Sequence, residues 1–139
     1  MAQVIFPLII ESGALDESTG KPIVDLAIND TTAARCGRHV AHATWFKDAS
    51  ASGSSHKGTV IHWAHNWLVG AITLRLPKWA MIRWVFPVAF SLYRKLVDCT
   101  KEEVFYTRQE LAGEMIQYVT QVLPEVQLRV FADGQYAKR

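Results

Sequence analysis

The chain has 139 residues, which is the size of one domain. Hydrophobic residues make up 50% and charged residues 20%, so the chain can bury a sizeable core and is expected to fold rather than to be intrinsically disordered. The formal net charge of +2 permits contact with a polyanion, but it is weaker than the basic excess that is typical of nucleic-acid-binding modules.

The cysteines and the apolar stretches predict a cytoplasmic protein that does not span a membrane. Cys36 and Cys99 are far apart, and the first residues show no secretory signal, so we expect reduced thiols in a cytoplasmic protein. Residues 60–76 and 79–92 are apolar but are interrupted by polar residues or proline. Neither stretch reaches the roughly 18 uncharged apolar residues of a membrane-spanning helix, so no membrane partner is expected.

In chain order, residues 1–21 form an N-terminal segment to which no separate fold is assigned, and residues 22–139 form one domain. Residues 22–30 are mostly apolar and predict a buried strand that ends at Asp30. Residues 33–38 are compatible with a helical turn or a loop. The small, polar residues 48–55 predict a surface loop.

The remaining elements follow from composition and spacing. Residues 59–63 and 67–76 are rich in β-branched and aromatic residues and predict strands, and residues 84–88 predict a weaker strand with Pro87 at its end or on an edge. Residues 128–132 predict a last strand that leads into Asp133. This order predicts an α/β fold, a mixed sheet with at least one helix packed on its face.

The clearest helix is predicted at residues 108–123. Thr107 is a plausible N-cap, and Glu110, three residues on, completes a capping box. Apolar residues at helical spacing predict one buried stripe, formed by Leu111, Met115, Tyr118, Val119 and Val122.

Two aspartates, Asp30 and Asp133, follow predicted strands that are far apart in the sequence. Ligands of α/β sheets gather outside the carboxyl ends of strands, so the two carboxylates would meet there if their strands are neighbours. Carboxylates suit Mg²⁺ or Mn²⁺, and two such ions can cleave a phosphodiester. In the alternative interpretation each aspartate simply starts a turn.

Five segments resemble a known family in one consistent order. They are Asn29-Asp30-Thr31-Thr32, His65-Asn66-Trp67, Leu92-Tyr93-Arg94-Lys95, Thr107-Arg108-Gln109-Glu110-Leu111-Ala112 and Ala132-Asp133-Gly134-Gln135-Tyr136. Across residues 22–139 the chain resembles the DDE superfamily of insertion-sequence transposases, whose catalytic domain has an RNase H-like fold. The resemblance implies that Asp30 and Asp133 are the first and second catalytic carboxylates. It also implies Mg²⁺-dependent (or Mn²⁺-dependent) DNA cleavage and strand transfer in DNA transposition.

The same resemblance implies which partners the protein binds, and the chain departs from the family in one respect. The partners would be DNA, as transposon ends and target, and a second copy in the intact enzyme, in the nucleoid region of a bacterial cytoplasm. The family's third carboxylate, a Glu on a later helix, has no counterpart among residues 134–139. We therefore interpret the chain as a transposase fragment with a sheet that is incomplete at the carboxyl end, weakly active or inactive alone.

Three alternatives stay open. Glu110 or Glu114 could supply a ligand from the helix before the last strand, as in ribonuclease H. Cys36, His39 and His42, or the pair His62 and His65, could instead stabilise a non-catalytic α/β binding module by holding zinc. Several basic residues could contact DNA phosphates or form a solvated surface: Lys47, Lys57, Arg75, Lys78, Arg83, Arg94, Lys95 and Arg108.

Overall fold

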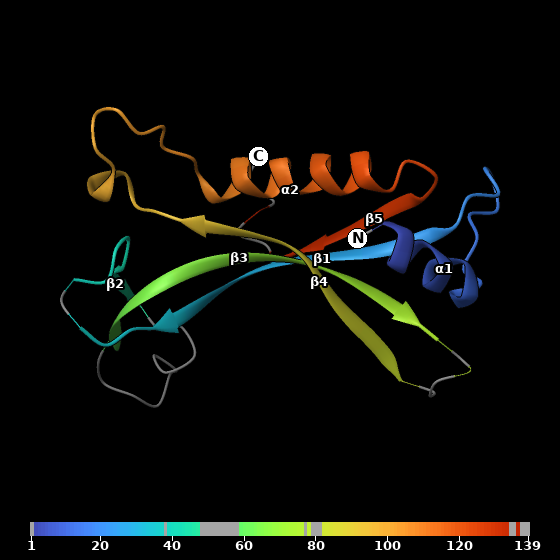
Figure 1. The fold of residues 1–139 in the computed structure, drawn as a ribbon, viewed down its shortest axis with the longest axis horizontal. Helices are drawn as coiled ribbons and strands as arrows, with labels where there is room; N and C mark the ends of the chain where they lie inside the picture. The colour runs from blue at the N-terminus through green and yellow to red at the C-terminus, as the bar shows by residue number, and fades with distance from the viewer. Residues whose placement is uncertain are drawn as a thin grey trace.

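The computed structural model describes residues 2–37, 39–47, 59–76, 78, 82–133 and 136. They fold as an α/β domain with a mixed five-stranded sheet and two α-helices (Figure 1). The predicted class, a mixed α/β sheet with at least one helix packed on it, is confirmed. The elements in chain order are α1 (Ala2–Ser12), β1 (Ile23–Ala34), β2 (Thr44–Lys47), β3 (Ile61–Arg75), β4 (Arg83–Tyr93), the 3₁₀ turn η1 (Leu96–Asp98), α2 (Arg108–Val122) and β5 (Gln127–Ala132).

The sheet is organised around β3, which pairs along both of its sides. β1 runs antiparallel on one side, and β4 and the short β2 run antiparallel on the other. β5 lies beyond β1 and is parallel to it. The connection between β4 and β5 contains α2, which lies along the sheet in Figure 1.

One face of the sheet and both helices form a single core. Alternate residues of β1 point to this face, since Val24, Leu26 and Ile28 are buried and the residues between them are only partly covered. The helices contribute buried apolar residues, namely Ile5 and Ile9 of α1 and Leu111, Ala112, Met115 and Val119 of α2. The opposite side of the sheet, called here the outer face, leaves Val85, Phe90 and Phe131 exposed.

Strand lengths differ from prediction. β1 does not end at Asp30 but continues to Ala34, because residues 31–34 pair with residues 64–67 of β3. Residues 33 and 34 are therefore strand, not part of a helical turn or loop. The two predicted strands at 59–63 and 67–76 are one continuous strand, β3, and β4 is longer than residues 84–88. Pro87 lies on an edge strand, opposite the irregularity at Gly70 and Ala71, as its missing N–H requires.

The N-terminal segment, to which no fold was assigned, contains a helix. Residues 2–12 form α1, whose Ile5 and Ile9 are buried in the core. This burial offsets Pro7, which removes a backbone donor inside the helix. The four-residue strand β2 was also not predicted, and the predicted loop at 48–55 lies outside the described residues.

The helical prediction is confirmed. α2 spans Arg108–Val122, and both hydrogen bonds of the capping box between Thr107 and Glu110 are present. Leu111, Met115 and Val119 are buried as predicted, whereas Tyr118 is 46% exposed and does not belong to the stripe. No helix in the described part of the chain is both long and apolar enough to cross a membrane.

Candidate functional site

The predicted site residues Asp30 and Asp133 both lie just beyond the end of the ladder that joins two adjacent strands, β1 and β5. The ladder between β1 and β5 ends where Ile28 pairs with Ala132. Asp133 follows that last pair by one residue and Asp30 by two. The parallel neighbourhood of the two strands, on which the predicted site depended, is therefore present, although Asp30 lies inside β1 and not at its end.

Asp30 is the centre of a polar cluster on the core side of the sheet. Its Oδ2 accepts a hydrogen bond from Asn66 Nδ2 at 3.0 Å and lies 3.4 Å from Arg108 Nε. Its Oδ1 accepts from the Tyr136 hydroxyl at 3.4 Å. The Asp30 side chain is only 18% exposed. Asp30, Asn66, Arg108 and Tyr136, together with Tyr93, which packs against Arg108, are called here the Asp30 cluster.

Neighbouring elements hold this cluster in place. Asn66 belongs to β3, faces the core and is 2% exposed, so its amide must find partners inside the protein. Arg108 is the first residue of α2, directly after the Thr107 cap. Its guanidinium lies 4.0 Å from the ring centroid of Tyr93, a cation–π contact, and its Nε also donates to Asn66 Oδ1 at 3.4 Å.

Tyr136 connects the two aspartates. Its backbone N–H donates to the Asp133 carbonyl at 2.9 Å, while its hydroxyl reaches Asp30. Burial raises the pKa of Tyr136 to about 12, and the negative charges of Asp30 and, more weakly, Asp133 act in the same direction. The phenol is therefore protonated at neutral pH, and both carboxylates act electrostatically on the same hydroxyl.

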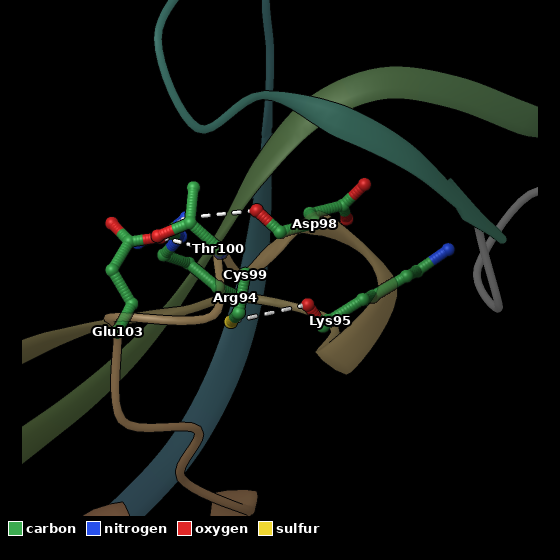
Figure 2. A network of polar contacts seen from close by, with 6 residues as sticks. All are labelled: Arg94, Lys95, Asp98, Cys99, Thr100 and Glu103. Atoms are coloured by element: carbon green, nitrogen blue, oxygen red, sulfur yellow. Dashed lines mark hydrogen bonds and ion pairs between the residues drawn. The ribbon is translucent and has the colours of Figure 1, made fainter.

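A second polar network folds the connection between β4 and α2 (Figure 2). Arg94 donates to both carboxylate oxygens of Glu103, at 2.6 and 2.9 Å, and to the Asp98 carbonyl. Thr100 donates to Glu103 Oε2 from its backbone and its hydroxyl, at 2.8 and 3.0 Å. The Arg94 hydrogen bonds, followed by those from Thr100, lower the pKa of Glu103 to about 2. This network fixes the segment that delivers Arg108 to Asp30.

Asp30 and Asp133 by themselves are an incomplete ligand set for a divalent metal. Among the residues that the structure describes, no three His, Cys, Asp or Glu side chains are grouped so that they could hold an ion. Arg108 already provides a positive charge beside Asp30. Glu110 accepts from the backbone and hydroxyl of Thr107, and Glu114 lines a hollow beside β4, so neither belongs to the Asp30 cluster.

The predicted Cys and His ligands are not assembled either, within the described residues. His65 uses both ring nitrogens: Nδ1 accepts from Arg35 Nε at 3.0 Å, so Nε2 carries the proton and donates to the Ala41 carbonyl at 2.8 Å. Cys36 is exposed and Cys99 is partly buried, and both are free thiols, as predicted. The described geometry therefore gives no support to the zinc-stabilised alternative.

Sequence reasoning did not identify the roles of Asn66, Arg108 and Tyr93 in the cluster. Asn66 carried a signal, because it is a polar residue within an apolar strand sequence. Arg108 was considered only as a DNA contact.

Comparisons with protein-family models, with curated proteins and with solved structures find no match to this chain.

Proposed function

We propose that the chain carries the fold of a DDE-type transposase catalytic domain, which is RNase H-like. In this proposal Asp30 and Asp133 are two of the carboxylates of a divalent-metal site that acts on DNA. One observation carries it: β1 and β5 are parallel neighbours, and Tyr136 links the aspartates that follow their last shared pair.

The order of the elements supports the proposed fold. Three long strands, β1, β3 and β4, are antiparallel, α2 follows, and β5 then returns beside β1 in the parallel direction. The family resemblance implies catalytic carboxylates at the ends of the first and the fourth strand, and Asp30 and Asp133 belong to β1 and to the end of β5, which is the fourth strand when the short β2 is left aside. β2 is a four-residue addition beside the start of β3.

Mg²⁺ or Mn²⁺ would supply Lewis-acid activation of a phosphodiester when bound. Asp30 and Asp133 alone do not complete such a site. This chain by itself is expected to cleave DNA weakly or not at all. The proposed partners are DNA and a second copy of the protein.

Arg108 gives the proposal a specific consequence. Its guanidinium lies 3.4 Å from Asp30 Oδ2, at the oxygen where a cation would bind. A metal ion that coordinates this oxygen is repelled by the guanidinium unless it displaces it. We therefore expect Arg108→Ala to bind Mn²⁺ about tenfold more tightly than the natural chain, which corresponds to ~1.4 kcal/mol.

Calorimetric titration of the purified chain with Mn²⁺ and Mg²⁺ tests the proposal. Asp30→Asn and Asp133→Asn should each lose most of the binding, because both carboxylates contribute to one site. Glu114→Gln is the matched control, since it removes a carboxylate outside the cluster, and it should bind like the natural chain. Absence of metal binding, or binding that neither aspartate variant changes, would favour a non-catalytic α/β binding module.

A supercoiled-plasmid nicking assay with the same proteins tests whether the chain by itself cleaves DNA. We expect little Mg²⁺-dependent nicking by the natural chain. Robust nicking that Asp30→Asn abolishes would overturn the expected inactivity while supporting the site. Robust nicking that survives Asp30→Asn would contradict the assignment of Asp30.

A further inference from the structure

A pocket far from the Asp30 cluster gathers three arginines. It opens on the outer face where β1 begins, β3 ends and β4 starts, close to the end of α1, and has a volume of about 160 Å³. Its charged side chains are Arg75, Arg83, Arg129 and Asp25, and Thr73 adds a hydroxyl. Along β1, Asp25 and Asp30 are five residues apart, roughly 17 Å, and they point to opposite faces. The arginine pocket and the Asp30 cluster are therefore separate sites.

The arginines of the pocket are not equivalent. Arg129 is neutralised, because its Nε and one terminal nitrogen lie 2.8 and 2.7 Å from Asp25 Oδ1. Neither Arg75 nor Arg83 makes an ion pair or a side-chain hydrogen bond with anything in the described part of the chain. With Asp25 counted, the pocket has a formal charge of +2.

The position of the two unpaired arginines is unfavourable for the protein alone. Arg75 and Arg83 are direct partners in the antiparallel ladder of β3 and β4. Like charges that face each other across two strands destabilise the sheet. Both side chains nevertheless line the same hollow. A bound anion would remove the repulsion, because it attracts both guanidiniums at once.

We propose that this pocket binds a dianionic phosphate group, held by Arg75 and Arg83 with help from Thr73. Guanidinium groups match the geometry of phosphate oxygens and donate two parallel hydrogen bonds to them. The formal charge of +2 equals the charge of a phosphate monoester in magnitude. The pocket is also large enough, since its volume is several times the roughly 30 Å³ that one water molecule occupies in the liquid. This inference does not depend on Asp30, Asp133 or any metal.

Thermal unfolding at constant ionic strength gives the first test. Inorganic phosphate, compared with chloride, should raise the Tm of the natural chain, and Arg75→Ala or Arg83→Ala should weaken phosphate binding at least tenfold. Lys78→Ala is the matched control, because it removes a positive charge three residues from Arg75 but outside the pocket lining. Its response to phosphate should equal that of the natural chain.

The repulsion between the arginines supplies an independent readout. In chloride alone, Arg83→Gln should raise the Tm by about 1–3 °C, because it removes one of two facing like charges. In phosphate the order should reverse, since only the natural chain gains from the ligand. A variant that merely disturbed the fold would lower the Tm in both solutions, and that result would contradict the proposal.

Fluorescence anisotropy identifies the source of the phosphate group. A 5′-phosphorylated oligonucleotide is compared with the same oligonucleotide carrying a 5′-hydroxyl. Preference for the phosphorylated end, lost in Arg83→Ala, would show that the pocket takes a phosphate monoester at a nucleic-acid terminus. Binding of inorganic phosphate without that preference would assign a small phosphorylated ligand. Equal behaviour of the natural chain, Arg75→Ala and Arg83→Ala toward all three probes would overturn the proposal.

Discussion

Replacement of Asn66 by alanine tests whether the Asp30 cluster forms as described. Asn66 donates to the Asp30 carboxylate at 3.0 Å from a position that is 2% exposed. A hydrogen bond to a charged group contributes roughly 1.5–3 kcal/mol, whereas the second bond, from Arg108 at 3.4 Å, is long and adds little. Arg108 remains beside Asp30 in the variant and limits the loss. We expect the free energy of unfolding to fall by about 2 kcal/mol.

Urea denaturation followed by tryptophan fluorescence measures this change, since the chain has five tryptophans. The same loss corresponds to a decrease in Tm of about 5–10 °C for a domain of this size. Gln117→Ala is the control, because Gln117 is exposed on α2 and its replacement should change stability by less than about 0.5 kcal/mol.

A second substitution at the same position separates the hydrogen bond from the volume of the side chain. Asn66→Asp keeps the shape but removes the amide donor and turns a second carboxylate toward Asp30. At neutral pH it should destabilise the protein at least as much as Asn66→Ala. An aspartate variant as stable as the natural chain, or an alanine variant within about 0.5 kcal/mol of it, would refute the described cluster.

Three further predictions concern the scaffold. Arg94 lowers the pKa of Glu103 in the folded state to about 2, from an ordinary value of 4.5. The stabilisation that Glu103 provides is therefore complete above pH 4.5 and is lost as the pH falls toward 2. Denaturation curves of Glu103→Gln and of the natural chain should accordingly converge as the pH falls through that interval. Gly70→Ala should stabilise by roughly 0.5–1 kcal/mol in calorimetry, because the new Cβ would lie 3.5–3.7 Å from three side chains, ordinary contact distances; a lower Tm would contradict this. Thr107→Ala removes the cap of α2 and should cost about 1 kcal/mol in urea denaturation, and an unchanged midpoint would contradict the capping geometry.

The parts of the fold that depend on neighbouring residues could be predicted from the sequence. The capping box and apolar spacing place α2 to within one residue at its carboxyl end, because a helix is built from contacts three and four residues apart. The extents of β1 and β3 could not be predicted in the same way. Residues 31–34 become strand only because β3 is present beside them, and that pairing is tertiary.

The candidate site shows the same division. That Asp30 and Asp133 follow apolar strands is readable locally, and the parallel pairing of these strands agrees with the prediction. The contact between Asn66 and Arg108 joins residues 42 positions apart, and nothing in either local sequence indicates it. α1 was missed because residues 2–12 are apolar and contain Pro7, so helical spacing is weakly expressed there.

The central claim is that Asp30 and Asp133 belong to one metal-binding site. Paramagnetic broadening by substoichiometric Mn²⁺, followed in amide NMR spectra, tests it most directly. We predict that the signals of Asp30 and Asp133 broaden together. Asp30→Asn or Asp133→Asn should each abolish the broadening at both positions, and Arg108→Ala should strengthen it at both. Broadening confined to one aspartate, or centred on His39 and His42 instead, would contradict the claim.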